Sequence, residues 1–374
     1  MSQNEATPNP QQAIGPSLGE VLLLALVACT IVISLVSLLH GYFALVDNFG
    51  DNNSYIRDAS AIRHWNFQGL VVKHFWGLPY AMAAFSTLTR ASDRTALLFI
   101  SCAAYFVTVV LAYRLWGGWI AGFFTILNFD WMHRSFLGGS EPLFVALLFG
   151  SFWAARRERW LLAALLTSFA TVVRPLGFFA LAGVGITLLW RKEFHKLFSA
   201  VAIGLSIGFL YILPFARHFG DPFATVNSYH SAEWEGGWLF GFPFVAIVKG
   251  TLLYPVPWTN LALDFGWIFL VLAGVLAMIF TKSFREYAKA HPVEIIFAGP
   301  YLWCIYSYNY PYWARVAFPR FSIPILPFVF LALDRWWPKD RRVLWAMGIV
   351  GPTLAASSAV GIKNVVEMLR RSWG

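Results

Sequence analysis

Apolar runs of about 20 residues recur between residues 21 and 360, and they constrain the fold of this chain more than any other feature. Hydrophobic residues make up 58% of the chain and charged residues 13%, and the mean hydropathy is +0.61. A soluble domain has roughly 45–50% apolar and about 25% charged residues, so one interior core cannot hold this excess. A β-barrel would show short alternating segments instead. The sequence therefore predicts an all-α, polytopic transmembrane helical bundle of about ten to eleven spans.

The chain divides into a polar tail and one membrane domain. Residues 1–17 are rich in Pro and Gln and contain no Lys or Arg, a composition typical of a disordered tail. They lack the positive region that begins a signal peptide, so Val21–Leu39 is expected to be a retained first span. Residues 18–374 are expected to form a single transmembrane domain without a separate soluble module.

The distribution of basic residues predicts which loops share a face. Four short loops hold 13 of the 28 Lys and Arg residues: 156–159, 191–196, 282–289 and 335–342. The positive-inside rule places these loops in the cytoplasm. The polar segments 41–73, 216–262 and 309–320 then lie on the outer face, where they could build one cleft. The apolar runs between residues 74 and 141 do not pair evenly, and we expect 74–89 to be an incomplete crossing.

The first outer loop, 41–73, holds the strongest catalytic candidate. Asp51 follows Gly50, which permits a tight turn, and precedes a polar run that contains Asn53 and Tyr55. A carboxylate here could accept a proton from an attacking hydroxyl as a general base. Alternatively, Asp51 could cap the helix that begins near Ser54.

Two further charged residues stand at breaks between apolar runs. Glu141 opens an apolar run after Ser140 and could be a second acid of the cleft. Alternatively, Ser140 caps a helix that begins here, and the negative charge of Glu141 interacts favourably with the dipole at its N-terminus. Arg174 precedes Pro175 inside an apolar stretch, and an ionisable residue there is a functional candidate. The alternative for Arg174 is a side chain that reaches out to the interface.

The segment 309–320 carries Arg315 and Arg320 on the face opposite the basic loops. Arginine binds phosphate oxygens through two parallel N–H groups, so this pair could hold the phosphate of a lipid-linked substrate. Anchoring to lipid headgroups is the alternative. The segment 216–262 mixes aromatic, amide and acidic side chains, which suits either carbohydrate or a bilayer surface.

Several classes of function are not indicated. The net charge of +9 is scattered over short loops, which argues against nucleic-acid binding. Cys29, Cys102 and Cys304 lie in apolar runs and are expected to be packing residues. No zinc-ligand spacing, phosphate-binding glycine loop or nucleophile elbow is present. No cofactor is required by the sequence, and a divalent cation remains open.

Taken together, these motifs resemble the GT-C superfamily of polytopic membrane glycosyltransferases, particularly the protein-mannosyltransferase-like and GPI-mannosyltransferase-like groups. The resemblance covers roughly residues 20–335. It rests on Asp51 and Tyr55 after a first span, and on a Pro-containing run at Pro79. It also rests on an acidic residue that opens a later span at Glu141, and on an Arg-Pro break at Arg174. The Arg-Pro-rich segment from Arg315 to Pro327 completes the pattern.

The resemblance implies transfer of a sugar, with mannose the first candidate, from a polyprenyl-phosphate donor to a lipid, glycan or protein hydroxyl with inversion. It implies Asp51 as the base and a donor phosphate bound by Arg320, with Arg315 or Lys73. Substrate-binding residues would be Asn53, Tyr55, His74, Glu141 and Arg174. The expected location is a bacterial plasma membrane, with the active site on the extracytoplasmic face.

A transporter or flippase of lipid-linked substrates is the alternative function. Transporters place ionisable residues near the bilayer midplane and often show two related halves. In this chain the ionisable residues cluster in predicted outer loops, and no internal repeat is evident. A cleft centred on Asp51 would favour the enzyme, and a midplane cavity with access from both sides would favour transport.

Overall fold

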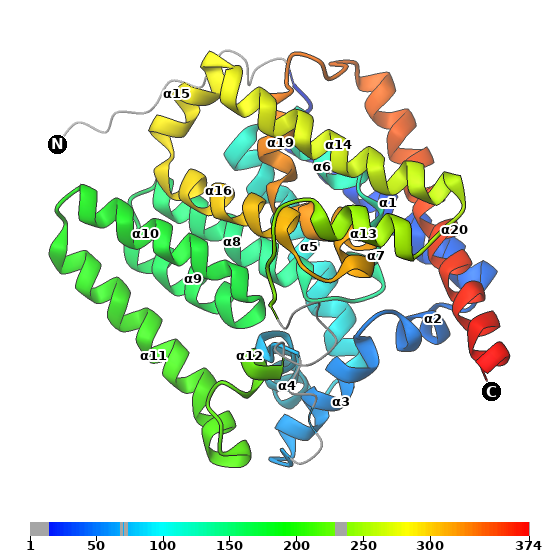
Figure 1. Ribbon diagram of the computed structural model, residues 1–374, viewed down its shortest axis with the longest axis horizontal. Coiled ribbons are helices and arrows are strands. Elements are labelled where there is room, and N and C mark those ends of the chain that lie inside the picture. Colours follow the sequence, from blue (N-terminus) through cyan, green and yellow to red (C-terminus); the bar gives the residue numbers. More distant parts are fainter. Residues whose placement is uncertain (1–14, 68–69, 71–73, 229–237, 374) are drawn as a thin grey trace.

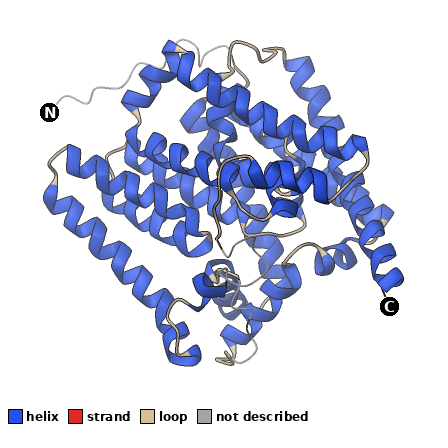
Figure 2. Ribbon diagram, viewed as in Figure 1, coloured by secondary structure: helices blue, strands red, loops and turns tan. Residues whose placement is uncertain are grey.

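The computed structural model describes residues 15–67, 70, 74–228 and 238–373, and within them the chain is helical without a strand (Figure 2). Five of the helices contain a segment long and apolar enough to cross a membrane: α1 (Leu18–Leu39), α5 (Asp93–Trp116), α11 (Phe194–Phe219), α14 (Trp258–Phe280) and α20 (Arg341–Trp373). At 1.5 Å per residue, a helix of about 20 residues spans the 30 Å hydrocarbon core. The predicted all-α polytopic membrane fold is confirmed.

Shorter and broken helices complete the bundle. The helices α7 (Phe129–Phe136) and α8 (Glu141–Arg156) pass the same test only together, and they bend by 104° at the break between them. The shorter apolar helices are α9 (Trp160–Val173), the run Pro175–Trp190 that contains α10 (Phe178–Trp190), and the run Phe318–Ala332 that contains α18 (Phe318–Ser322) and α19 (Leu326–Ala332). The number of crossings that these helices add stays a prediction.

The remaining helices are short or amphipathic. They are α2 (Tyr42–Asn48), α3 (Asn52–Arg63), α4 (Gly77–Thr89), α6 (Gly118–Ile126), α12 (Ala224–Asn227), α13 (Val245–Leu253), α15 (Lys282–Ala290), α16 (Pro292–Ser307) and α17 (Pro311–Val316). With 13 residues, α4 is too short to cross a bilayer alone, in line with the incomplete crossing expected at 74–89. At the N-terminus, the Ser17 hydroxyl accepts a hydrogen bond from Glu20 N and caps α1.

The helices pack around one large apolar core. In Figure 1, α1 and α20 lie side by side at one edge although they come from opposite ends of the chain, and α8, α9 and α10 lie together at the other. The centre is filled by buried aromatic side chains, among them Trp131, Phe124, Phe149 and Phe152. By contrast, only 6% of the span in α11 is buried, which suits a helix surrounded by lipid. The helices α3 and α4 lie together at one end of the bundle (Figure 1).

Candidate active site

A cavity of about 380 Å³ opens where five parts of the chain meet. The N-terminus of α3, the segment before α4, the start of α8, the break between α9 and α10, and the stretch from residue 308 to residue 321 all contribute to its wall. Its lining residues are Asp51, Tyr55, His74, Phe75, Ser140, Val173, Arg174, Pro175, Tyr308, Tyr310, Trp313, Ala317, Arg320 and Phe321. Five of the residues predicted from the sequence therefore line one cavity: Asp51, Tyr55, His74, Arg174 and Arg320.

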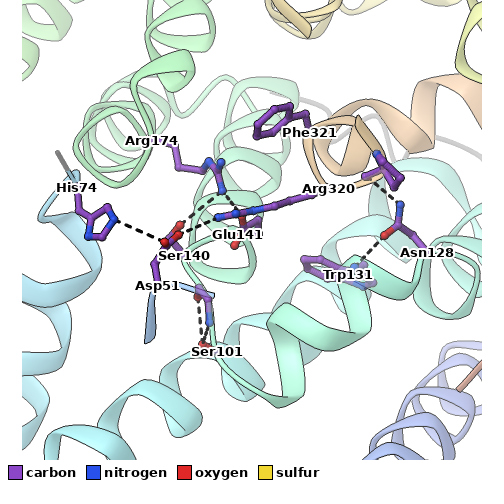
Figure 3. Close-up of polar contacts among 12 residues, drawn as sticks. Asp51, His74, Ser101, Asn128, Trp131, Ser140, Glu141, Arg174, Arg320 and Phe321 are labelled. Atoms are coloured by element: carbon purple, nitrogen blue, oxygen red, sulfur yellow. Dashed lines mark hydrogen bonds and ion pairs between the residues drawn. The ribbon is translucent and has the colours of Figure 1, made fainter. Parts of the chain in front are cut away.

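Asp51 occupies the N-cap position of α3, but its side chain makes no capping hydrogen bond. Its carboxylate instead faces the cavity, with Oδ1 3.6 Å from His74 Nε2 and Oδ2 3.6 Å from Arg320 Nη2 (Figure 3). The side chain is 38% exposed, so it remains accessible. The geometry thus favours the chemical interpretation of Asp51 over the capping one.

The environment of Asp51 keeps it ionised. Burial raises the pKa of the carboxyl, but His74 and the guanidinium of Arg320 act in the opposite direction and hold the pKa well below its usual range. Burial and the nearby negative charge of Asp51 also raise the pKa of Tyr55 to about 12, so this phenol keeps its proton. The cavity therefore presents one carboxylate acceptor beside neutral and cationic donors.

Gly50 places Asp51 through its conformation and its small size. Its φ is +54°, in the left-handed region that favours glycine. A Cβ at this position would lie 2.3 Å from Nη1 of Arg134, a buried residue of α7. Arg134 also stacks on Phe49, with its Cζ 4.8 Å from the ring centroid. Only a glycine lets the turn before Asp51 approach this guanidinium so closely.

Glu141, the first residue of α8, lies directly beneath the cavity with an exposure of 2%. Its Oε1 accepts hydrogen bonds from both Arg174 Nη1 and Arg320 Nε (Figure 3). Arg320 therefore bridges two carboxylates, Glu141 and Asp51. Glu141 does not face the cavity as a second acid. It is a buried counter-ion that fixes two guanidinium groups.

The break between α9 and α10 places Arg174 in this cluster. Arg174 has extended backbone angles, as expected before a proline, and Pro175 begins a short 3-10 turn. Its side chain is 21% exposed and is held by Glu141 rather than extended to the interface. Ser140 does not cap α8 with its side chain. Its hydroxyl lies 3.4 Å from Tyr55 Oη and 3.5 Å from Arg174 Nη1.

Close packing and one amide position the other walls. A Cβ on Gly77 would lie 2.6 Å from the backbone of Val172, so the start of α4, and with it His74, can approach the end of α9 only through a glycine. Asn128 donates from Nδ2 to the carbonyl of Pro319 (2.9 Å) and accepts from Trp131 N (2.8 Å). This links α7 to α18 next to Arg320.

Two residues predicted for the site, both in the described part of the chain, lie away from this cavity. Arg315 is fully buried elsewhere, where its Nε lies 3.2 Å from Asp264 Oδ2 and its Nη1 donates to the carbonyl of Tyr254 at 3.0 Å. Asn53 is exposed and points away from the cavity into a separate groove on the other side of α3. Lys73 lies outside the described residues.

Other site residues were missed by the sequence interpretation or given no role. Arg134 supplies a third guanidinium near Asp51 and Glu141, and an ionisable residue in a short segment between two apolar runs was the signal that could have found it. The aromatic walls at Tyr308, Tyr310 and Trp313 carried no signal among so many aromatic residues. Within the described part of the chain, no group of three or more His, Cys, Asp or Glu side chains is placed to hold a metal ion.

The fold and the cavity together define an integral, multi-pass membrane protein with a charged site between its helices. The sequence matches no protein-family model and no curated protein sequence.

Among solved structures, the chain is similar to ArnT from Cupriavidus metallidurans bound to undecaprenyl phosphate, with a TM-score of 0.50 and 14% sequence identity over 91% of this chain. The apo structure of the same protein gives a TM-score of 0.47 and 16% identity over 89% of this chain. The chain spans 64% and 62% of the length of these two structures. At this identity the likeness concerns the fold alone: over most of its length the chain is folded like ArnT.

Proposed function

We propose that this protein is a glycosyltransferase that moves a sugar from a polyprenyl-phosphate donor to an acceptor hydroxyl, with inversion at the anomeric carbon. The observation that carries the proposal is the cavity itself, in which an accessible Asp51 carboxylate stands beside Arg320 and Arg174. The ArnT-like fold supports it, since the ArnT structure holds undecaprenyl phosphate.

The arginines are arranged to bind the donor phosphate. Glu141 holds both guanidinium groups from below, while Arg174 and Arg320 keep 21% and 16% of their side chains exposed. An anion can therefore bind them without first having to order two flexible side chains. Arg134 is a third guanidinium near Asp51 and Glu141, so it adds to the positive potential that a phosphate would meet in the cavity.

The rest of the cavity suits a sugar. Its volume of about 380 Å³ lies at the lower end of the range for small-molecule sites, so it holds a sugar and a phosphate while a long polyprenyl tail stays outside. Tyr308, Tyr310 and Trp313 provide aromatic faces and polar groups, the combination that binds a ring with apolar faces and hydroxyl edges. Mannose is the first sugar to test.

The reaction follows from these positions. Asp51 accepts the proton of the acceptor hydroxyl, whose oxygen forms a bond to the anomeric carbon. The bond from that carbon to the phosphate oxygen breaks, and the polyprenyl phosphate leaves with the electron pair. Arg320 and Arg174 stabilise the negative charge that grows on the leaving phosphate. Arg320 also lies beside Asp51, so the base and the donor phosphate are both within reach of one guanidinium group.

The proposal also includes the class of acceptor and the membrane in which the protein lies. The expected acceptor is a lipid, glycan or protein, and the expected location is a bacterial plasma membrane with the site on its extracytoplasmic face. No step above depends on a divalent cation.

A transfer assay in proteoliposomes tests the proposal. Radiolabelled polyprenyl-phosphate sugars, including mannose, glucose and arabinose, are supplied with lipid and cell-envelope acceptors. The expected result is covalent transfer of one sugar, with the opposite anomeric configuration in the product by NMR. Movement of labelled lipid across the bilayer without covalent transfer would instead support the transporter alternative. Glu286→Gln neutralises an exposed carboxylate on α15, and this control protein should transfer the sugar as the wild type does.

A further inference from the structure

A second, larger hollow lies on the opposite side of α3 from the cavity. It is a groove of about 760 Å³ between α3, the end of α2 and the start of α5. Its lining residues are Asp47, Asn53, Ile56, Arg57, Ser60, Ala61, His64, Asn66, Ser92, Asp93 and Arg94. The function proposed above uses none of them.

The groove follows one face of α3 over its whole length. Its α3 residues stand at positions 53, 56, 57, 60, 61 and 64, which is the spacing of a single helical stripe. At the N-terminal end the stripe reaches Asn53, two residues after Asp51. The cavity takes Asp51 and Tyr55 from the other face of the same helix. Along the chain, Asn53 thus brings the N-terminal end of the groove within two residues of the proposed base.

The charges at the groove balance, but one guanidinium, that of Arg57, is open to solvent and weakly paired. Arg94 Nη2 lies 2.5 Å from Asp47 Oδ2, and Asp93 Oδ2 lies 3.1 Å from Arg63 Nη2, so both carboxylates already have a cationic partner. Arg57 is 59% exposed and has only a long contact, of 4.0 Å, with the buried carboxylate of Asp58. Its guanidinium can therefore bind an incoming anion.

The other groups of the groove suit hydroxyls. Ser60, Asn53 and His64 supply hydrogen-bonding side chains along the same face, and His64 Nδ1 lies 2.8 Å from the carbonyl of Ser60. Beside the groove, the α2 residue Phe43 is 57% exposed under the guanidinium of Arg94, which contacts its ring at 5.7 Å. An apolar rim of this kind lets a lipid-anchored headgroup enter as readily as a free saccharide.

We propose that this groove is the acceptor site and that it binds a saccharide bearing an anionic group, with Arg57 holding the anion. The inference rests on the proposed function, because a transferase needs an acceptor site in addition to the donor site. A sugar and a phosphate would fill the cavity, whereas the groove has twice its volume and reaches Asn53, two residues along the chain from Asp51.

Binding measured without turnover tests this assignment. The full chain in lipid nanodiscs is titrated with maltotriose 1-phosphate, with neutral maltotriose, and with the same phosphorylated headgroup on a dialkylglycerol anchor. The variants are Arg57→Gln, which removes the charge, and Ser60→Trp, which fills the groove. Arg217→Gln, an exposed arginine on α11, is the matched control.

The expected result is that a phosphorylated probe binds more tightly than maltotriose and loses about tenfold or more in affinity in Arg57→Gln. Ser60→Trp weakens all probes, and Arg217→Gln changes none. Tighter binding of the anchored probe than of the free one identifies a lipid-linked acceptor, and equal binding identifies a soluble glycan. Absence of binding by every probe, or binding that both groove variants leave unchanged, overturns the inference.

Titration of the same samples with undecaprenyl phosphate separates this inference from the proposed function. We expect the affinity for undecaprenyl phosphate to be the same in wild type and in both groove variants, since Arg57 and Ser60 do not line the cavity. If undecaprenyl phosphate does not bind at all, the proposed donor is wrong whatever the groove binds. If it binds and the saccharides do not, only the acceptor site is wrong.

Discussion

Replacement of Glu141 by glutamine is expected to destabilise the fold more than any other change of one carboxylate at the site. The substitution keeps the size of the side chain and removes one negative charge. That charge is the shared partner of Arg174 and Arg320, and the side chain of Glu141 is only 2% exposed. Without it, the largely buried Arg174 loses the carboxylate that binds it, and Arg320 keeps only the more distant Asp51, 3.6 Å away.

The magnitude follows from the burial of the partners. Breaking a buried ion pair by removing one member costs about 3–5 kcal/mol. Arg174 and Arg320 keep 21% and 16% exposure, so water can partly solvate them and the lower end applies. We expect a loss of about 3 kcal/mol in the free energy of unfolding, or roughly 150-fold in the unfolding equilibrium constant.

Unfolding by SDS in mixed micelles measures this change. Glu286→Gln is the control, since Glu286 is 67% exposed in a 3.8 Å pair with Lys282 and is expected to contribute nothing measurable. The double variant Glu141→Gln with Arg174→Gln should regain part of the lost stability, because it removes one uncompensated charge. A Glu141→Gln protein as stable as wild type would refute the counter-ion role.

Three further outcomes follow from the same geometry. Because the pKa of Asp51 is depressed in the folded protein, its stabilising contribution is present above the unfolded-state pKa and is lost only as pH falls through the lower folded-state pKa. For the same reason Asp51 stays ionised between pH 5 and 8, so the pH profile of kcat/KM should show no acid limb from it in that range. Arg320→Gln removes a nearby positive charge and should move the acid limb to higher pH. Gly50→Ala should lower stability by more than the backbone cost of about 1–2 kcal/mol, because its Cβ would also displace the Arg134 guanidinium, and it should lower kcat. Gly220→Ala, at a φ of +68° with open space around its Cβ, should show only that backbone cost in the same unfolding and kinetic assays. Arg315→Gln should lower stability by about 3 kcal/mol, since it breaks a buried pair, while the KM for the donor stays unchanged.

The sequence predicted the class of fold because hydropathy alone demands membrane spans. The same reasoning located the break at Arg174, since a proline after an arginine cannot continue a helix in an apolar run. It could not predict the 104° bend between α7 and α8, which depends on how the two segments pack. The count of spans stays a prediction, because the length of such short and bent helices does not show how many crossings they make.

The site shows the same division. Asp51, His74 and Arg320 stood out because charged residues are rare in this chain, and all three line the cavity. Arg315 and Arg320 looked equivalent in sequence, yet a turn at Ala317 separates their helices and sends one guanidinium to Asp264 and the other to Glu141. Which partner each arginine meets is decided by tertiary packing, and the sequence carries no local signal for it.

The central claim is that Asp51 is the base of a sugar transfer, and the most direct test is transfer by Asp51→Asn protein under saturating donor. The substitution keeps the shape of the side chain and removes the proton acceptor. The account predicts that transfer falls by at least about a hundredfold, the usual contribution of a general base, while undecaprenyl phosphate still binds and the protein remains folded. Transfer at the wild-type rate by the folded variant would contradict it.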